Sequence, residues 1–374
     1  MRILVNAKFG THKTGVGRVI TSLISALSKI DKKNIYFIYL NKDKLTCLLD
    51  LNNNFIKLTN GIKSKNVILN HFFSSVILLI KSLLLDIDLI IIPQISFMPF
   101  KTKKMIFFQH DLAEYYIPNQ KWYKLLFRRL ILPRMHKLAD KIIAVSNNTK
   151  KDIIKILKTE EKKIEVIYNG VDLNLFCVMD RRKSKDILRE KYMINDDFIL
   201  FVGEITHPQK NLINLIRSYK RYREEYESHH KLVLVGKKGK DYRIIENEIH
   251  KLGLANDIIL TGYIEDFELP YFYNAASIFC FISLYEGFGL PILESMACGC
   301  PVIASNVSCM PEIAGDAAIL VHPEDIENIV KSMNELIKNE DMRKALIEKG
   351  LERCRLFSWE EAAKKLLFII NNIN

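Results

Sequence analysis

Residues 278–305 read IFCFISLYEGFGLPILESMACGCPVIAS, and this stretch decides the fold. An apolar run rich in Ile and Phe opens it, and a glycine-rich loop follows. Gly287 and Gly289 let the backbone approach a ligand closely. Pro291 suits the first turn of a helix and Gly299 suits its end. The stretch therefore predicts a strand, a glycine loop and a helix whose first amides and positive dipole end form a natural phosphate site.

Two carboxylates bracket this glycine loop. Glu286 precedes it and Glu294 lies in the opening turn of the expected helix, so both can face one ligand. Carboxylates accept hydrogen bonds from paired hydroxyls, which a sugar or a ribose offers. The alternative is an ordinary connector whose glutamates are solvated. Finding two glutamates around one glycine loop disfavours that alternative.

Short apolar runs alternate with longer amphipathic runs, twice along the chain. Near-continuous apolar strands separated by helical stretches indicate parallel sheets that are covered on both faces. Such sheets bind ligands at the carboxyl ends of their strands. We predict strands at residues 2–6, 35–40, 88–92, 104–108, 141–145 and 164–168, and again at 198–203, 231–236, 257–261, 278–282, 301–304 and 318–321.

This alternation predicts an α/β fold of two facing, doubly wound Rossmann-like domains with the active site in the cleft between them. The polar, charge-rich stretch 173–196 marks the break. We therefore expect an N-terminal domain at residues 1–172 and a C-terminal domain at 173–357. A last helix, at about 358–374 with Ser358 as its N-cap, is expected to pack back on the N-terminal domain.

The composition and the charge limit the possible functions. The 374 residues are 49% hydrophobic and 26% charged, which excludes disorder, collagen and simple repeats. Residues 1–172 hold 29 Lys and Arg against 13 Asp and Glu, whereas residues 173–374 hold 26 against 30. A basic half indicates an anionic surface as partner, either a nucleic acid or a membrane. Because no helix-turn-helix, zinc-finger or RNA-binding signature accompanies the charge, we expect no nucleic acid.

A basic segment at 121–137, which contains Trp122 and Phe127, has the composition of an interfacial helix. A half-buried helix with a solvated basic face is the alternative. The apolar stretch 76–92 is interrupted by charged residues, so we expect a buried or surface helix leading into a strand rather than a membrane span.

The cysteines and the start of the chain indicate the compartment. Seven cysteines are an odd number without the spacing of a zinc site, so free thiols in a reducing compartment are expected. The opening MRILVNAKFG is too short for a signal peptide and is interrupted by Lys8. We expect a cytoplasmic protein that docks on the cytoplasmic face of the inner membrane.

The pattern E-G-F-G-L-P-x-x-E at 286–294 resembles the E-x7-E signature of the family-four retaining glycosyltransferases (glycosyl transferases group 1), which have the GT-B architecture of two Rossmann-like domains. Other short motifs follow in the order and spacing of that family. They are Gly15-Val16-Gly17-Arg18, which looks like its N-terminal glycine loop, Gln109-His110-Asp111, Ala144-Val145-Ser146, Asn169-Gly170-Val171-Asp172, Phe201-Val202-Gly203 and Lys210-Asn211-Leu212.

The resemblance implies a role for each matching residue. Glu294 would hold the ribose hydroxyls of the nucleotide, and Glu286 the hydroxyls of the donor sugar. Lys210 would neutralise the diphosphate, whose charge grows as the glycosidic bond breaks. His110 would contact the sugar near the reacting carbon, and Arg18 would close on the donor's phosphates or on the acceptor.

The catalytic set implied by the resemblance is His110, Lys210 and Glu286. The backbone at 262–264 would read the nucleobase edge in the C-terminal, nucleotide-sugar-binding domain, and the N-terminal domain would face the acceptor. The donor-binding residues implied are Gly15, Gly17, Arg18, Lys210, Gly262, Tyr263, Ile264, Glu286, Gly287, Phe288, Gly289, Leu290 and Glu294.

One position departs from the family pattern. Many relatives carry an arginine directly after the F-V-G glycine, and here it is Glu204. An acid beside a diphosphate would repel it, so either Glu204 points away or another cation substitutes for the arginine. Arg18 and His207 are the candidates, and the sequence does not choose between them.

The tripeptide Asp86-Ile87-Asp88 spells D-x-D, which binds a divalent metal in a different glycosyltransferase fold. Here it precedes the strand expected at 88–92, at the amino end and away from the expected ligand edge. We therefore expect no metal site, and no cofactor besides the nucleotide diphosphate sugar, which is a co-substrate.

The resemblance thus implies a retaining, metal-independent hexosyltransferase. It would move a hexose, with mannose as the guess from similarity to surface-polysaccharide enzymes, to a lipid-linked, oligosaccharide or polysaccharide acceptor. Tyr115 and Tyr116 could form an acceptor platform or simply pack in the core. Two alternatives remain: a nucleotide-sugar epimerase of the same architecture, and a nucleic-acid-binding protein that uses the basic N-terminal domain.

Overall fold

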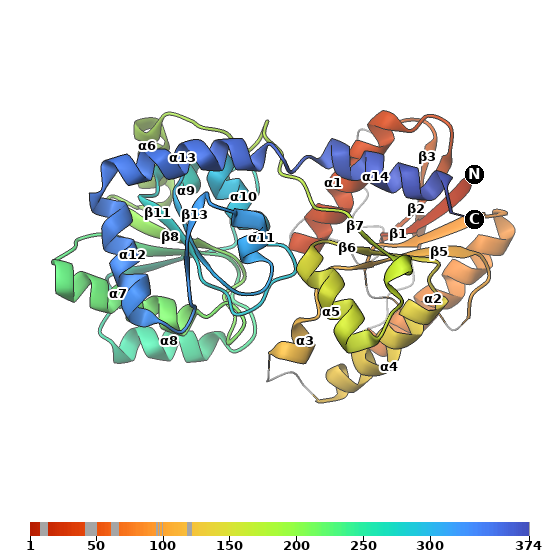
Figure 1. Ribbon diagram of the computed structural model, residues 1–374, viewed down its shortest axis with the longest axis horizontal. Coiled ribbons are helices and arrows are strands. Elements are labelled where there is room, and N and C mark those ends of the chain that lie inside the picture. Colours follow the sequence, from red (N-terminus) through yellow and green to blue (C-terminus); the bar gives the residue numbers. More distant parts are fainter. Residues whose placement is uncertain are drawn as a thin grey trace. The chain divides into compact units, whose positions relative to one another are not determined.

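The computed structural model describes residues 1–7, 14–41, 51–60, 67–94, 96, 98, 100–117 and 122–373, and the chain divides into two compact units. Unit 1 consists of residues 1–112, 120–170 and 358–374, and unit 2 of residues 113–119 and 171–357. Each unit is built on a parallel sheet with helices around it (Figure 1). The prediction of two doubly wound α/β domains is confirmed.

The described part of unit 1 contains a seven-stranded sheet in which every pair of neighbouring strands is parallel. The six strands predicted for the first half are all present. In spatial order the strands are β3 (Phe55–Asn60), β2 (Ile35–Asn41), β1 (Arg2–Asn6), β4 (Leu89–Ile92), β5 (Lys104–Gln109), β6 (Lys141–Ala144) and β7 (Ile164–Val166).

Strand β3 is the strand that the sequence analysis missed. Its sequence FIKLTN mixes three apolar with three polar residues, which suits a strand at the edge of the sheet. Phe55 is buried there, whereas Ile56 is 42% exposed. The analysis looked for continuous apolar runs, which are typical of central strands.

Helices α1 (Gly15–Ile30) and α14 (Trp359–Asn371) pack side by side in unit 1 (Figure 1). Ser358 caps α14, since its hydroxyl accepts from the amides of Glu360 and Glu361. Leu366 and Ile370 are buried in the same hydrophobic core as the apolar face of α1. The C-terminal helix therefore completes the core of the unit in which the chain begins.

A close backbone approach accompanies this packing at Gly170. A Cβ atom added there would lie 2.3 Å from the amide nitrogen of Trp359, so any side chain would displace the start of α14. The other helices of unit 1 are α2 (Val67–Leu84), α4 (Trp122–Leu138), α5 (Asn147–Leu157) and the 3-10 turn η2 (Glu161–Lys163).

The described part of unit 2 contains a six-stranded parallel sheet. All six strands predicted for the second half are present. The strand order reverses direction between β8 and β11, which places two neighbouring strand ends at a point where ligands bind in open α/β sheets. In spatial order the strands are β10 (Ile258–Gly262), β9 (Lys231–Val235), β8 (Phe198–Val202), β11 (Ile278–Phe281), β12 (Val302–Ser305) and β13 (Ala318–Val321).

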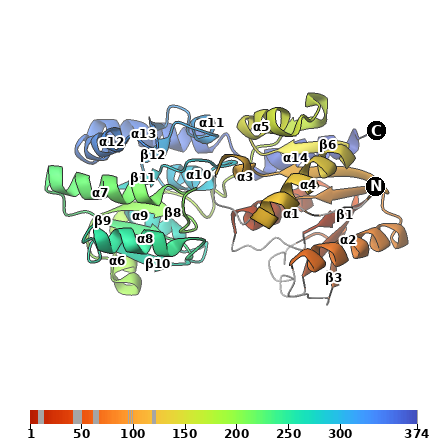
Figure 2. The same ribbon diagram turned by 90° about the horizontal axis from the view of Figure 1, so that it is seen from below.

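Two groups of helices cover this sheet. One group is α7 (Leu212–Tyr226), α8 (Tyr242–Lys251) and α12 (Ile326–Lys338), and Figure 2 shows α8 running alongside α7. The other is α6 (Arg181–Tyr192), α9 (Leu269–Ala275), α10 (Leu290–Ala297) and α13 (Glu340–Cys354). Right-handed crossovers place helices on opposite faces when the strand order reverses. The two short helices are α3 (Ala113–Tyr116) and α11 (Met310–Ala314).

The unit boundary differs from the expected 172/173 in two ways. It falls between Gly170 and Val171, and residues 113–117 with α3 group with unit 2 although the sequence analysis placed them in the N-terminal domain. A ring contact accounts for the second difference: Tyr116 in α3 stacks on Tyr285 of unit 2, with ring centroids 4.8 Å apart.

No helix of the described residues combines the length and the apolar character that a membrane crossing requires. The apolar stretch 76–92 forms the end of α2, a turn and β4, as expected. Both carboxylates of the D-x-D tripeptide lie before β4, as expected: Asp88 accepts from the amide of Arg2 at 2.7 Å, whereas the Asp86 side chain is 91% exposed and lies 4.0 Å from Lys103 Nζ. The six described cysteines are free thiols, as predicted.

Candidate functional site

The loops after β8 and β11 meet at the carboxyl edge of unit 2, because these two strands are neighbours. Lys210 lies after β8 and Glu286 after β11. Lys210 Nζ donates to Glu286 Oε1 at 2.6 Å, and their side chains are only 16% and 13% exposed. The ammonium also lies 5.5 Å from the centre of the Phe281 ring. Screening by salt is weaker for such an enclosed ion pair than for one at the surface.

Side-chain to backbone hydrogen bonds fix the loop that carries Lys210. Asn211 caps α7 in the left-handed conformation, with φ 55°. Its buried amide group donates to two backbone carbonyls, at 3.1 and 2.6 Å. Gln209 bonds to the backbone at 284–285 in both directions, at 2.9 and 3.1 Å. These hydrogen bonds therefore hold the backbone around Lys210 in place. They do not involve the lysine side chain, which can still change its rotamer.

The loop that carries Glu286 is held by Ser308. The Ser308 hydroxyl donates to the carbonyl oxygen of Glu286 at 2.7 Å and accepts from its amide at 3.3 Å. The preceding residue, Tyr285, is buried, and its ring stacks on that of Tyr116, a residue that is 43% exposed. Tyr116 thus packs on the residue before Glu286 and still exposes part of its ring to solvent.

Glu294 lies one helical turn into α10 and is 3% exposed. The hydroxyl of Tyr273, in α9, donates to Glu294 Oε2 at 2.9 Å. The neighbouring helices α9 and α10 therefore place this carboxylate, because a buried charge requires hydrogen-bond partners. The sequence analysis did not single out Tyr273, which reads as an ordinary core aromatic.

The glycine loop leads into α10 as predicted. Gly289 is the N-cap residue with φ 95°, a conformation that favours glycine, and Pro291 lies in the first turn. Gly299, with φ 69°, follows the helix end. The side chains of Phe288 and Leu290 are 5% and 9% exposed and serve the core. What this loop can offer a ligand is therefore its backbone, at the positive end of a helix.

Glycines end three neighbouring strands of the same sheet. Gly203 donates from its amide to Val235 O at 2.9 Å, and Gly236 donates to Gly262 O at 2.9 Å. A Cβ atom on Gly236 would lie 1.8 Å from the carbonyl oxygen of Gly203, so no side chain fits there. Gly262 has φ 76° and open space where its side chain would be. This row leaves bare backbone at the edge where the resemblance places the nucleotide.

The residues around the expected nucleobase pocket belong to the same edge. The sequence analysis singled out Gly262, Tyr263 and Ile264 but missed Gly236. The signal was available, because K-L-V-L-V-G at 231–236 ends like F-I-L-F-V-G at 198–203. Ile264 is buried and the Tyr263 hydroxyl donates to Glu265 at 3.3 Å.

The structure gives Glu204 a partner that the sequence did not suggest. Glu204 and Lys237 follow Gly203 and Gly236 at the ends of neighbouring strands, and Lys237 Nζ lies 3.5 Å from Glu204 Oε1. The side chains are 45% and 48% exposed, so both can change partners. His207, one of the two candidates named from the sequence, has a buried Nδ1 without a hydrogen-bond partner among the described residues.

The remaining candidates belong to unit 1. His110 directly follows β5, and its Nε2 donates to the carbonyl oxygen of Pro93 at 2.6 Å. Because a carbonyl only accepts, Nε2 carries the proton in this contact. Burial lowers the pKa of His110, although the Pro93 carbonyl and Asp111 oppose this. The imidazole is therefore uncharged at neutral pH.

A second histidine stands behind this turn, and the sequence analysis did not identify it. His136, in α4, lies 3.1 Å from Gln109 Oε1 and 3.0 Å from the Thr159 hydroxyl, and Gln109 donates to the carbonyl of Asp111. Burial, assisted by Lys163, lowers the pKa of His136 to about 3. This uncharged relay fixes the strand end that presents His110.

The glycine motif of unit 1 is helical where it was expected to be a loop. Gly15 and Gly17 form the first turn of α1, and Thr14 caps the helix by accepting from the Gly17 amide at 3.1 Å. Gly15 has open space in place of a side chain, whereas Gly17 is buried and Arg18 is half-buried. Residues 8–13, before this turn, lie outside the described part of the chain.

Two family models match the chain, one on each half of the sequence. The model described as "Glycosyltransferase Family 4" matches residues 13–175, and the model described as "Glycosyl transferases group 1" matches residues 184–353. The second match contains the loops of Lys210, Glu286 and Glu294, and the first contains Arg18 and His110.

Two similar proteins of known name are mannosyltransferases. The O-antigen chain mannosyltransferase B of Escherichia coli is 27% identical over 72% of this chain and 71% of its own length. The serotype-specific mannosyltransferase WbdA of Escherichia coli is 31% identical over 60% of this chain, which corresponds to 28% of its own length. The chain therefore spans less than a third of WbdA.

Among solved structures, sucrose-phosphate synthase from Thermosynechococcus elongatus resembles the chain with a TM-score of 0.81 and 19% sequence identity. The superposition covers 100% of this chain and 99% of that one. At this identity the likeness establishes the fold and leaves the ligands of the two proteins to be compared separately.

Proposed function

This chain belongs to the glycosyl transferases group 1 and to glycosyltransferase family 4, and from that membership we propose that it transfers a hexose from a nucleotide diphosphate sugar to a lipid-linked or polysaccharide acceptor with retention of anomeric configuration. The observation that carries the proposal is the enclosed contact between Lys210 and Glu286. An ammonium and a carboxylate held together at the ligand edge of the sheet match the phosphate and the hydroxyls of such a donor.

The ion pair supports an exchange of partners on donor binding. Without a donor, Glu286 neutralises Lys210 in a site where a lone charge would be costly. When the donor arrives, its diphosphate takes the place of the carboxylate beside Lys210, and Glu286 accepts hydrogen bonds from the sugar hydroxyls instead. Charge on the leaving phosphate rises in the transition state, so Lys210 stabilises that state more than the bound donor.

Glu294 and the glycine row bind the rest of the donor in this proposal. The carboxylate of Glu294 accepts from the ribose hydroxyls, and Tyr273 holds it in position. The bare backbone at Gly203, Gly236 and Gly262 leaves room for the nucleotide. The amides at the start of α10 contribute their positive dipole end to the phosphates.

We also propose that Lys237 supplies the cation that the family arginine supplies elsewhere. It lies beside Glu204 on the neighbouring strand end, so the acid and its neutralising cation occupy the position together. Both side chains are nearly half exposed, and an approaching diphosphate would draw Lys237 away from Glu204. This reading replaces the two candidates named from the sequence, Arg18 and His207.

The reaction proposed is a front-face substitution without a protein nucleophile. The bond between the anomeric carbon and the phosphate oxygen breaks, and the bond to the acceptor oxygen forms on the same face. The acceptor's proton passes to the departing phosphate oxygen. Lys210, Lys237 and the α10 amides supply positive charge in this metal-independent scheme, and the uncharged His110 lends a hydrogen-bonding imidazole near the reacting carbon.

Mannose is the proposed sugar, since two relatives, at 27% and 31% identity, are mannosyltransferases by name. The test is a panel of nucleotide diphosphate sugars followed by an assay of transfer to acceptor glycans. Proton NMR of the product reports the anomeric configuration. Transfer from one donor with retention supports the proposal, and appearance of an epimer without an acceptor would establish the epimerase instead.

We further propose that unit 1 docks on an anionic membrane surface. Residues 1–172 carry the basic charge excess, and α2 exposes apolar side chains, with Leu83 64% and Leu84 79% exposed. Flotation with phosphatidylglycerol vesicles should recover the protein at low salt, and replacing Leu83 and Leu84 by Asp should weaken recovery. Met193→Asp, which alters an 82% exposed side chain of unit 2, is the control. Equal recovery with neutral vesicles at low and high salt would contradict the proposal.

A further inference from the structure

A basic hollow of about 470 Å³ lies at the amino edge of the sheet in unit 2, the edge opposite to Lys210 and Glu286. Asp197, His230 and Ser277 line it, and each directly precedes a strand: β8, β9 and β11 respectively. These strands have four or five residues. At about 3.3 Å per residue, the hollow lies roughly 15 Å from the donor-binding edge. One bound donor cannot fill both places.

Four cationic side chains line this hollow, and Asp197 is the single carboxylate among its described lining residues. Arg181, Arg182 and Lys185 come from α6, and Arg343 comes from α13. Asp197 Oδ1 takes Lys185 at 2.6 Å and Arg181 at the longer distance of 3.4 Å. One carboxylate cannot neutralise four cations, so the hollow carries a net positive charge.

The two remaining arginines of the hollow, Arg182 and Arg343, form few interactions with the described residues. Arg343 Nη1 donates to the carbonyl oxygen of Ile337 at 3.4 Å, which is a long contact. Arg182 is exposed and forms no ion pair with any residue in the described ranges. Both guanidinium groups keep their donor forks for another partner. A guanidinium fork matches the geometry of phosphate oxygens, to which it can bond bidentately.

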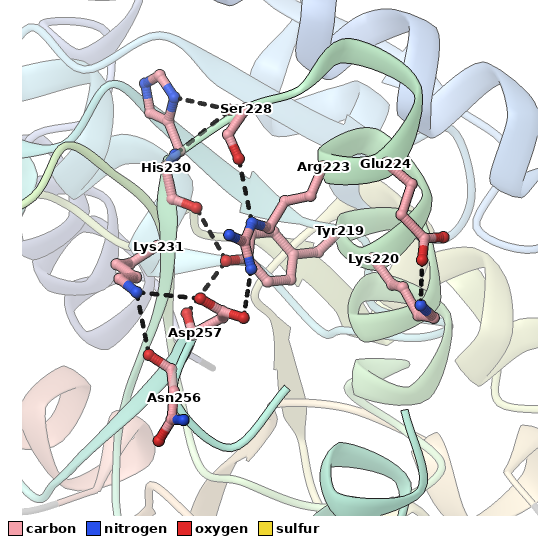
Figure 3. Close-up of polar contacts among 9 residues, drawn as sticks. All are labelled: Tyr219, Lys220, Arg223, Glu224, Ser228, His230, Lys231, Asn256 and Asp257. Carbon is pink, nitrogen blue, oxygen red and sulfur yellow. Dashed lines mark hydrogen bonds and ion pairs between the residues drawn. The ribbon is translucent and has the colours of Figure 1, made fainter. Parts of the chain in front are cut away.

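A second hollow at the same edge shows the opposite arrangement (Figure 3). There Arg223 forms an ion pair with Asp257, and Lys231 Nζ lies 3.0 Å from the other oxygen of that carboxylate. Lys220 pairs with Glu224 on the same helix. The chain's own carboxylates neutralise these cations, and their role is structural. No such set of carboxylates lines the first hollow.

The floor of the basic hollow is polar. The Ser277 hydroxyl accepts from Arg181 Nη2 at 3.3 Å and lies 3.1 Å from His230 Nε2. Ser228 holds the other ring nitrogen of His230 at 3.1 Å, and Figure 3 shows Ser228 in turn bonded to Arg223. The neutralised cluster of the second hollow thus fixes the histidine that faces the first. A preformed polar floor under free guanidinium groups suits a hydrogen-bonding anion rather than an apolar ligand.

We propose that this hollow is a second ligand site, which binds a small anion carrying one or two phosphate groups. The volume falls within the range of small-molecule sites. The ligand's phosphates bridge Arg181, Arg182 and Arg343 and relieve the repulsion among them. Free phosphates and phospholipid headgroups share this chemistry. The site is independent of the donor: its cations lie at the other end of the strands.

Isothermal titration with inorganic diphosphate at low salt tests the proposal. Lys210→Ala protein is titrated alongside the wild type, because diphosphate also fits the donor edge. Binding in the Lys210→Ala protein should remain, and the further change Arg181→Gln with Arg343→Gln should weaken it about tenfold or more. Arg182→Gln, at an exposed position, should weaken binding without affecting folding.

The matched control removes two lysines from α12 and α13 outside the hollow, by Lys331→Gln with Lys344→Gln, and should leave binding unchanged. Phosphatidylglycerol vesicles that displace diphosphate would identify a lipid headgroup as the source, and absence of displacement would identify a free phosphate. No diphosphate binding in the Lys210→Ala protein, or equal loss in the control and the arginine variants, would overturn the proposal.

Discussion

Lys210 Nζ and Glu286 Oε1 lie 2.6 Å apart although 76 residues separate them in the sequence. The contact exists because the strands before their loops, β8 and β11, are neighbours where the strand order reverses. The same relationship gives the proposed exchange of partners, in which a diphosphate replaces a carboxylate beside the ammonium.

Glu286→Gln separates the sugar-binding role from the nucleotide-binding role. The amide keeps a hydrogen bond to Lys210 but loses the negative charge, and it accepts less strongly from the sugar hydroxyls. We expect kcat to fall by at least about tenfold, with the Kd of the free nucleoside diphosphate changing far less. Steady-state kinetics and titration calorimetry on the same preparation check this. A Kd that rises as much as kcat falls would contradict the assignment of Glu286 to the sugar.

Tyr273→Phe removes the hydroxyl that holds Glu294. Leaving a buried carboxylate without its hydrogen-bond donor lowers the free energy of unfolding by about 1–3 kcal/mol. Unit 2 should therefore be less stable, and its affinity for the nucleotide should fall. Tyr219→Phe is the control, because that hydroxyl also bonds inside unit 2, to the carbonyls of His230 and Asp257 at the opposite edge. The control should lose stability and keep its nucleotide affinity. Equal affinities in the two variants would contradict the role of Tyr273.

Lys237→Ala tests the proposed replacement for the family arginine. Loss of the cation leaves Glu204 facing the diphosphate alone, so the donor's Kd should rise about tenfold and the dependence on salt should weaken. Lys240→Ala removes the same charge from the same loop, at a lysine paired with Asp241. The measurement is donor titration at two salt concentrations. If both variants bind the donor alike, Lys237 does not fill the arginine's place.

His136 should make unit 1 sensitive to acid. Its pKa is lowered to about 3 in the folded protein and is about 6.5 in an unfolded chain. Below about pH 6.5 the unfolded chain therefore binds a proton that the native state excludes, and this contribution to stability is lost as the pH falls. The loss amounts to as much as about 1.4 kcal/mol per pH unit.

His136→Gln should remove that part of the pH dependence while keeping polar contacts to Gln109 and Thr159. Both tryptophans of the chain, Trp122 and Trp359, belong to unit 1, so their fluorescence during urea unfolding reports on the right unit. The difference in unfolding free energy between wild type and variant should change as the pH falls from neutral. Parallel pH profiles would show that His136 is not buried in its uncharged form.

Much of the fold could be predicted because the decisive signals are local. Strands β8 and β11 are continuous apolar runs, and Gly289, Pro291 and Gly299 mark the start and end of α10 through their own backbone preferences. Strand β3 was missed because this edge strand mixes polar with apolar residues and forms no continuous apolar run. The glycine motif at 15–18 was mistaken for a loop because glycine disfavours a helix. Thr14, which caps α1, was the residue that could have indicated the helix start.

The site could be predicted only in part, because some of its members act through tertiary contacts. Glu286, Glu294 and Lys210 stand in recognisable motifs. Tyr273 and His136 do not, since each matters only through the residue that it contacts across a helix pair or a strand end. Lys237 becomes a candidate only when the register of β8 and β9 sets it beside Glu204.

The most direct measurement is the turnover of the Lys210→Ala protein with the donor that the panel identifies. Removing one preorganised charge from the leaving diphosphate should lower kcat/KM by two or more orders of magnitude, about 3 kcal/mol. The protein without donor should stay folded but melt at a lower temperature than the wild type, because Glu286 loses its ion-pair partner. Lys210→Arg should recover part of the rate. Turnover close to that of the wild type in Lys210→Ala would mean that the leaving group departs elsewhere, and the proposed site would be wrong.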